Sequence, residues 1–326
     1  MKHPICSVFG LAVLASDSLV SSASAVLSID FVTVGNAGNA ADTTGYGAVA
    51  YEYKIAKNET TIGQYAEFLN AVAKSDPYAL YNPSMASTTK IAGISRSGSS
   101  GSYSYSPVAG SVNKPITYVS WFDAARFCNW MHNGEGSGST ETGAYTLNGA
   151  MSGIYTVNPG ATAWIPGEDE WYKAAFYDAT KGGTGGYWRY PTQSKTMTTN
   201  DIGVAGAANY YDANGFAVYT GSGDGRWGIT DVGIYGANSD SFYGTNDQGG
   251  NVYEWNDAVV SGSSRGLRGG SYSSADIFFL ASSYRDSNVP SLENANIGFR
   301  VATVPEPSGV VLTLLASGML ATRRKR

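Results

Sequence analysis

The sequence predicts a single α+β domain with little regular secondary structure. Three segments carry helical signals, the strand candidates are short, and the stretches between them are rich in Gly, Ser and Asn. Hydrophobic residues make up 43% of the 326 residues and aromatic residues 13%, which predicts a packed core rather than a disordered chain. The length allows about two domains, but one large domain fits it equally well.

Each predicted helix has a local signal. The first follows Thr60 and Thr61, and its apolar residues recur at helical spacing. The second begins after Ser120, because Ser120 and Asp123 have the spacing of a capping box. The third begins after Pro166, with acidic residues at its positive end. The apolar faces contain Tyr65, Phe68, Leu69 and Val72; Trp121, Ala124, Ala125 and Cys128; and Trp171, Ala174 and Ala175.

The strand candidates are residues 51–55, 270–272 and 298–301. Long segments without a helix or strand pattern connect these elements, notably 95–111 and 214–231. Loops of this length in a compact domain are usually functional or need an additional constraint. Since the chain has too few cysteines for a disulfide framework, bound ions are the expected constraint.

The composition excludes several classes of protein. Two Cys cannot form a four-cysteine zinc site, and two His cannot form a three-histidine metal site. The net charge is −5 and the body of the chain has no basic run, so we expect no nucleic-acid partner. Only 14% of the residues are charged, against about 25% in a typical globular chain.

The first 25 residues have the organisation of a secretory signal peptide. Lys2 and His3 precede the apolar stretch 8–15, and Ala23-Ser24-Ala25 matches a cleavage site for small residues. A buried N-terminal helix is the alternative interpretation.

The last segment, 304–326, contains Pro305-Glu306-Pro307, an apolar run over 309–321 and a basic cluster over 323–326. As a helix the apolar run spans about 20 Å, which is shorter than the ~30 Å hydrocarbon core. The three parts resemble the PEP-CTERM sorting tail, which in exported bacterial proteins is recognised and removed by an exosortase. A plain membrane anchor is the alternative.

These terminal segments predict an exported protein of a Gram-negative-type bacterium. The expected location is the cell envelope, the outer surface or the extracellular matrix, and the chain would contact a membrane only through its terminal segment. The body, 26–303, then has a net charge of about −8. It contains one Cys and one His. We expect Cys128 to be a core residue rather than a nucleophile, and His132 to be structural or at the surface.

Seven ordered motifs span the body and carry a family resemblance. They are NETTIGQY (58–65), PITYVSWFDA (115–124), IPGEDEW (165–171), GGNVYEW (249–255), RGGSY (268–272), YRD (284–286) and NIGFR (296–300). The set resembles the formylglycine-generating-enzyme (sulfatase-modifying-factor) family. The resemblance implies a C-type-lectin-like α+β fold as a single domain over 26–303.

The resemblance also implies two structural calcium sites, which mix carboxylate and carbonyl oxygens as calcium prefers. At the first, Asp247 and Glu254 would supply carboxylates. At the second, Asn209 and Asp224 would supply side-chain oxygens. The implied carbonyl ligands are those of Gly250, Val252, Tyr210 and Arg226. The alternative is that these acids and amides are ordinary turn residues.

The chain departs from the family at its catalytic positions. The family oxidase holds copper(I) with two cysteines, and Ser274 and Phe279 stand at those positions here. Neither side chain offers the soft sulfur that copper(I) requires, so we expect no copper and no formylglycine-generating oxidase activity. One body His is too few for the family's non-haem-iron branch, and no nucleophile-elbow motif suggests a hydrolase.

Two function hypotheses follow. The first is a non-catalytic, lectin-like module that binds a glycan, a matrix component or an envelope protein, with Trp121, Trp171 and Trp255 in its core. The second is an enzyme of altered chemistry in the family groove. Its weak catalytic candidates are Ser271, Tyr272, Ser274 and Arg285, with Arg300 as an anion contact. Structural ion pairs are the alternative role for Arg285 and Arg300.

Overall fold

The computed structural model describes residues 27–88, 91, 93–197, 199–212 and 228–305. The predicted signal peptide, most of the predicted sorting tail, and Asp224 and Arg226 therefore lie outside the described residues. Within the described ranges, no helix is long and apolar enough to cross a membrane.

The three predicted helices are present. Helix α1 spans Ile62–Val72, α3 spans Trp121–His132 and α4 spans Glu168–Phe176. The Thr61 hydroxyl accepts a hydrogen bond from the Gln64 amide (3.2 Å), and the Gln64 side chain accepts one from the Thr61 amide (2.8 Å). Ser120 and Asp123 form the predicted capping box at α3. Short helical turns occur at α2 (Ser84–Ser87), η1 (Lys181–Gly183) and η2 (Ile277–Leu280).

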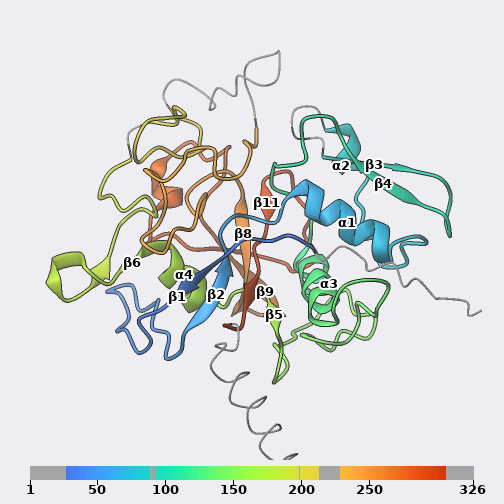
Figure 1. The fold of residues 1–326 in the computed structure, drawn as a ribbon, viewed down its shortest axis with the longest axis horizontal. Helices are drawn as coiled ribbons and strands as arrows, with labels where there is room; N and C mark the ends of the chain where they lie inside the picture. The colour runs from blue at the N-terminus through green and yellow to red at the C-terminus, as the bar shows by residue number, and fades with distance from the viewer. Residues whose placement is uncertain (1–26, 89–90, 92, 198, 213–227, 306–326) are drawn as a thin grey trace, which may run out of the picture.

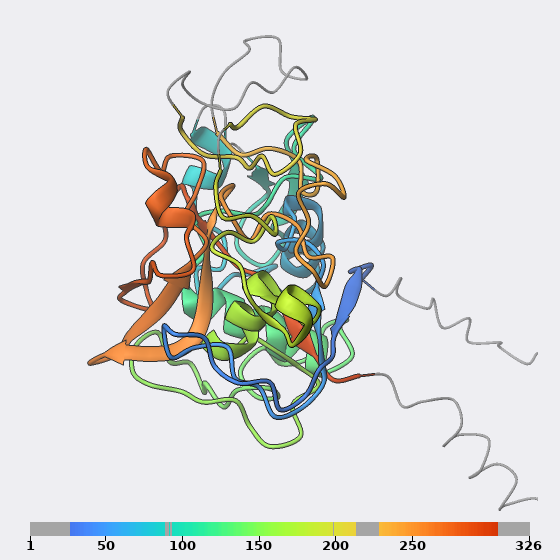
Figure 2. The ribbon, with the colours of Figure 1, turned by 90° about the vertical axis from the view of Figure 1, so that its left-hand side faces the viewer.

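One four-stranded antiparallel sheet joins the two ends of the described chain. Its order is β1-β2-β12-β5, so only β2 separates the first strand, β1, from the last strand, β12. The strands are β1 (Phe31–Val34), β2 (Tyr53–Ala56), β12 (Ala302–Thr303) and β5 (Ala163–Trp164). In Figure 2 the blue start and the red end of the described chain approach each other beside this sheet.

A second four-stranded sheet has the order β10-β9-β8-β11. Its strands β8 and β9 lie near the middle of the view in Figure 1 and toward one side of the domain in Figure 2. Strand β8 pairs antiparallel with β9 and parallel with β11. The strands are β8 (Tyr253–Ser261), β9 (Ser264–Arg268), β10 (Asp286–Asn288) and β11 (Ile297–Gly298). Two small ribbons, β3–β4 (Ile94–Ser97 with Ser104–Pro107) and β6–β7 (Tyr177–Asp178 with Gly186–Tyr187), complete the described strands.

The strand predictions were only partly right. The strand predicted at 51–55 is present, but as β2 it spans Tyr53–Ala56. The candidate at 270–272 is wrong, because β9 ends at Arg268 and positive φ angles at Gly269 (+96°) and Gly270 (+72°) turn the chain. Residues 298–301 are divided between β11 and an irregular stretch. There Phe299 and Val301 still accept backbone hydrogen bonds, from Thr60 and Ala56.

Aromatic side chains fill the main core, as the composition predicts. The centroid of the Phe127 ring of α3 lies 5.3 Å from the ring centroid of Phe68 of α1 and 5.4 Å from that of Phe299. The predicted core tryptophans Trp121, Trp171 and Trp255 are all completely buried. The prediction that Cys128 is a core residue is also confirmed, since its side chain is completely buried and burial raises the pKa of its thiol well above the usual range.

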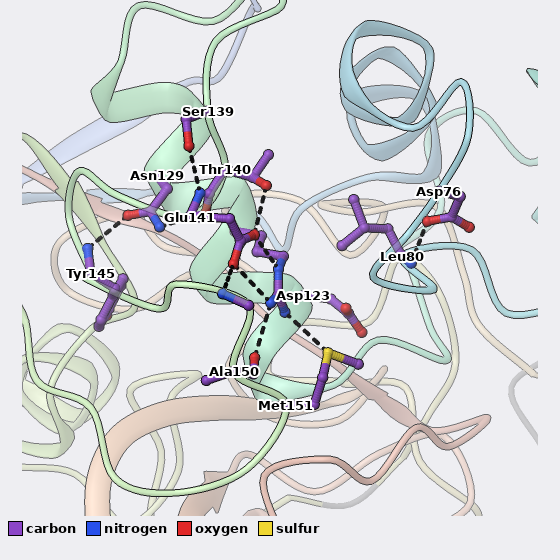
Figure 3. Close-up of polar contacts among 12 residues, drawn as sticks. Asp76, Leu80, Asp123, Asn129, Ser139, Thr140, Glu141, Tyr145, Ala150 and Met151 are labelled. Carbon is purple, nitrogen blue, oxygen red and sulfur yellow. Dashed lines mark hydrogen bonds and ion pairs between the residues drawn. The ribbon is translucent and has the colours of Figure 1, made fainter. Parts of the chain in front are cut away.

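The long segment after α3 is fastened to that helix by polar contacts rather than by secondary structure (Figure 3). Arg126 donates to both carboxylate oxygens of Glu141, at 2.7 and 3.1 Å, and also to the Ala150 carbonyl. The Asn129 side chain donates to the Thr140 carbonyl (2.6 Å) and accepts from the Tyr145 amide (2.7 Å). Two helix residues thus order a loop that has no strands of its own.

Candidate functional site

Two of the weak catalytic candidates stabilise a turn after β9. Ser271 is completely buried and Ser274 is 6% exposed. The Ser274 hydroxyl accepts a hydrogen bond from the Ser271 amide (3.0 Å), and the Ser271 hydroxyl shares one with Ser273 (3.0 Å). The Asn296 amide nitrogen lies 3.4 Å from the Ser271 hydroxyl. An amide group cannot remove a proton from a serine, so this contact supplies no general base.

The Tyr272 side chain packs against the main core and is partly buried. Burial raises the pKa of its phenol to about 12, with a smaller contribution from Tyr118. The group therefore stays protonated at neutral pH. Its backbone amide donates to the Asn251 carbonyl (2.8 Å), which joins the turn to the predicted calcium segment.

Phe279 lies in η2 among other aromatic rings. Its ring is perpendicular to that of Tyr284 at 4.9 Å and lies 6.1 Å from Phe278. It also packs against a small buried cluster that includes Leu280 and Tyr210. The position is thus part of an apolar contact.

Arg285 forms an ion pair, which is the alternative role that the sequence allows for it. Its guanidinium donates to both oxygens of Glu168, at 2.7 and 2.5 Å. Arg268 donates to the same carboxylate, at 3.0 and 2.6 Å. Glu168 is the first residue of α4, so its acidic side chain joins the helix N-terminus to β9 and to the segment before β10.

Arg300 also forms an ion pair, and its partner is Glu254 of the first predicted calcium site. Both side chains are completely buried. Arg300 Nε lies 2.6 Å from Glu254 Oε2, and Nη2 lies 2.7 Å from Oε1. Trp171 donates its indole N–H to Oε2 as well (2.7 Å). The Glu254 carboxylate is therefore held in one orientation by three donors.

The segments that carry the two predicted calcium sites contact each other. The Asn251 amide donates to the Asn209 carbonyl (2.7 Å), and the Asn209 side chain donates to Asn251 Oδ1 (3.0 Å). Gly250 is needed at this contact. Its φ is +93°, and a Cβ there would lie 2.3 Å from the Asn209 carbonyl oxygen. Asn209 Oδ1 is buried and has no hydrogen-bond partner among the described residues.

Three acidic groups and one arginine share this buried region. Burial raises the pKa of Glu59 well above its usual range, and the charges of Asp247 and Glu254 raise it further. Burial also raises the pKa of Asp247 to about 6, although the Gly233 amide and Arg300 oppose the shift. Sequence reasoning missed Glu59 as a member of this cluster, because it lies almost 190 residues before Asp247.

No cluster of three or more His, Cys, Asp or Glu that could hold a metal ion occurs in the described part of the chain. The first predicted calcium site would not require one, because the resemblance implies two carboxylates together with the carbonyls of Gly250 and Val252. Of the second site, only Asn209 and Tyr210 are described.

A cavity with a volume of about 430 Å³ lies elsewhere, beside the sheet that joins the chain ends. Its lining comes from β2 and the residues before it, the segment 157–170, Asp257 of β8, and Val304 and Pro305. The sequence contained no local signal for it, because these segments are far apart in the chain.

A family model described as the sulfatase-modifying factor enzyme 1-like domain matches residues 32–304. The chain belongs to this family. The predicted single α+β domain is confirmed by the match and by the structure. A search of curated proteins found no match.

Similar solved structures include CarF, with 21% identity, a TM-score of 0.49 and coverage of 86% of this chain and 100% of that one. Variable protein 1 of Treponema denticola has 19% identity, a TM-score of 0.47 and coverage of 84% and 95%. PvdO from Pseudomonas aeruginosa has 18% identity, a TM-score of 0.45 and coverage of 85% and 92%.

Within this sulfatase-modifying-factor-like domain, the His132 side chain contacts Thr162, the residue before β5. Its ring nitrogen Nδ1 lies 2.9 Å from the Thr162 hydroxyl and accepts from the Thr162 amide (3.1 Å). Nδ1 therefore serves as an acceptor, and the histidine connects the end of α3 to the start of β5. This is the structural role that the sequence predicts.

Proposed function

We propose that the protein is an exported, non-catalytic binding module that recognises a glycan, a matrix component or an envelope protein. The proposal rests on the residues at the two positions where the resemblance implies copper-binding cysteines, Ser274 and Phe279. Ser274 is 6% exposed and its hydroxyl accepts from a backbone amide. Phe279 packs edge-on against Tyr284. Neither position offers a soft ligand for copper(I).

The alternative, an enzyme of altered chemistry, has less support. The Ser271 and Ser274 hydroxyls hold a turn together, and Arg285 is paired with Glu168. Cys128 is the one cysteine among the described residues, and it is completely buried. These groups lack the exposure and the neighbouring base that an activated nucleophile needs.

Calcium is the cofactor that we propose, in a structural role. Asn209 Oδ1 is a buried acceptor that no described residue satisfies, which suits a cation ligand because buried polar atoms are normally hydrogen-bonded. The acidic groups Glu59, Asp247 and Glu254 share a single buried arginine, so a divalent cation at the Asp247–Glu254 segment would balance their charge. Glu254 Oε2 accepts two hydrogen bonds and Oε1 accepts one, so Oε1 keeps a lone pair for calcium.

Export and sorting remain proposals that rest on the terminal sequence patterns. We propose that residues 1–25 direct secretion, that an exosortase recognises the segment 304–326, and that the mature protein resides at the outer surface or in the matrix of a Gram-negative-type bacterium. No nucleic-acid partner is proposed, since the body is acidic.

The test is to measure retention of the purified full-length protein on envelope and extracellular-matrix fractions, together with its metal content. Saturable retention and bound calcium are expected. An absence of retention on every fraction would contradict the binding role. Stoichiometric copper or iron with oxygen uptake would instead establish the enzyme alternative.

A further inference from the structure

The 430 Å³ cavity beside the first sheet has the size of a small-ligand pocket, for which the usual range is about 300–1,000 Å³. It is separate from the Ser271–Ser274 turn and from both predicted calcium segments, since none of their residues lines it. Val304 and Pro305, the last described residues, form part of its rim.

Two aromatic rings of the cavity are held by one carboxylate. Tyr51 donates its hydroxyl to Glu170 Oε1 (2.7 Å), and Trp164 donates its indole N–H to Oε2 (2.9 Å). Glu170 is itself fixed, because Oε2 also accepts from the Gly167 amide at the start of α4 (2.7 Å). The rings are thus positioned before any ligand binds, which reduces the entropy cost of binding.

Tyr51 is 54% exposed, although its hydroxyl is tethered. A large aromatic ring that is exposed and held at its polar end is accessible to a ligand. Tyr53 is completely buried behind it, with its ring 6.2 Å from that of Tyr51. Tyr51, Tyr53 and Trp164 thus give the cavity an aromatic wall.

The described lining of the cavity is acidic in composition. It includes Glu52, Glu170 and Asp257 and no lysine or arginine. Two cations are close to these acids. Arg265 contacts Asp257 Oδ1 (3.0 Å), and the charge of Glu52 opposes the lowering by burial of the pKa of Lys173. The Asp257 side chain is 15% exposed to solvent. Aromatic faces and carboxylates both attract an organic cation.

From these observations we propose that the cavity binds a glycan that carries free amino groups. An ammonium group would lie near Glu52 and Asp257, and a sugar ring would pack on the Tyr51 face. This inference rests on the proposed binding function and specifies its ligand class. A neutral glycan uses only the aromatic wall, whereas an amino sugar uses the wall and the charge together.

The experiment compares two tetrasaccharide probes by titration calorimetry on the purified full-length protein. One is a tetramer of glucosamine and the other is a tetramer of N-acetylglucosamine, which has the same rings without the charge. We expect the glucosamine tetramer to bind about tenfold more tightly or better, and its affinity to fall as salt is added. Equal affinities for the two probes would overturn the proposal.

Two variants locate the site. Tyr51→Ala removes the exposed ring and Glu52→Gln removes an exposed charge, and each is expected to weaken glucosamine-tetramer binding by about fivefold or more. Tyr211→Ala and Glu67→Gln are the matched controls, because both residues are exposed and neither lines the cavity. Wild-type binding by Tyr51→Ala would also overturn the assignment.

A lysine tetramer distinguishes a glycan from a basic peptide. If it binds as tightly as the glucosamine tetramer, the glycan assignment is wrong. A failure of the glycan assignment can be distinguished from a failure of the proposed binding function, because retention on matrix fractions is measured in a separate experiment. Retention that survives Tyr51→Ala would leave the binding role in place and reject only this cavity as its site.

Discussion

Glu254 and Arg300 form a completely buried, two-point ion pair, with nitrogen–oxygen distances of 2.6 and 2.7 Å. Arg300 uses its remaining donors on the carbonyls of Ala56, Lys57 and Asn246. One guanidinium therefore joins β8, the end of β2 and the segment that precedes the first predicted calcium site. Because the pair is desolvated, removal of one partner leaves a buried charge without compensation.

The first prediction concerns this pair. Arg300→Met is expected to lower the free energy of unfolding by about 3–5 kcal/mol, because Glu254 is left buried and unpaired. Arg96→Met is the control, since Arg96 is 27% exposed and lies 3.4 Å from Asp76. Urea unfolding measures both variants. A loss for Arg300→Met no larger than that for Arg96→Met would contradict the structural role.

The second prediction concerns calcium. Saturating calcium at about 100 times its dissociation constant should raise the unfolding free energy by about 2.7 kcal/mol, and a chelator should reverse the effect. Asn209→Ala removes the unpartnered acceptor and should reduce the calcium-dependent increment. Asn288→Ala, at an exposed position, should leave the increment unchanged. A wild-type protein whose stability is independent of calcium would refute the proposed sites.

The third prediction concerns pH. Burial raises the pKa of Asp123 to about 7, and Glu293 adds to the shift while Ser120 and Arg126 oppose it. Between about pH 4 and pH 7 the unfolded carboxyl is ionised while the folded one keeps its proton, so the stability due to this group falls as pH rises. Above pH 7 the loss is complete.

Asp123→Asn stays neutral at every pH and removes this dependence. The difference in unfolding free energy, wild type minus variant, should decrease by up to about 1.4 kcal/mol per pH unit across that window. Unfolding in urea at pH 4, 5.5 and 7 measures it. A pH-independent difference would show that the folded carboxyl titrates normally.

The fourth prediction concerns backbone proximity at the contact between the two calcium segments. Gly250→Ala would place a Cβ 2.3 Å from the Asn209 carbonyl oxygen, in addition to the strain of a φ of +93°. Gly101→Ala has a nearly identical φ of +94° but meets nothing within 4 Å. The control should cost about 1 kcal/mol and Gly250→Ala clearly more. Equal losses in thermal unfolding would show that the contact can relax.

The sequence predicted well where the physical cause is local. The caps at Thr61 and Ser120 act over three residues, and the apolar faces of α1 and α3 recur within single helices, so both could be read directly. The predicted strand at 270–272 failed, because two glycines with positive φ turn the chain there. Those angles depend on tertiary contacts, such as the one between Gly270 and Leu280.

By itself the sequence determined the family and the single α+β domain, and it places Ser274 and Phe279 where the resemblance implies copper-binding cysteines. Only the tertiary structure decided what the charged residues do. It paired Arg300 with Glu254, placed Glu168 between Arg268 and Arg285, and assembled the acidic aromatic cavity. Composition and motifs report residue types and local spacing, whereas these ion pairs join residues 46 to 117 positions apart and exist only once the core has packed.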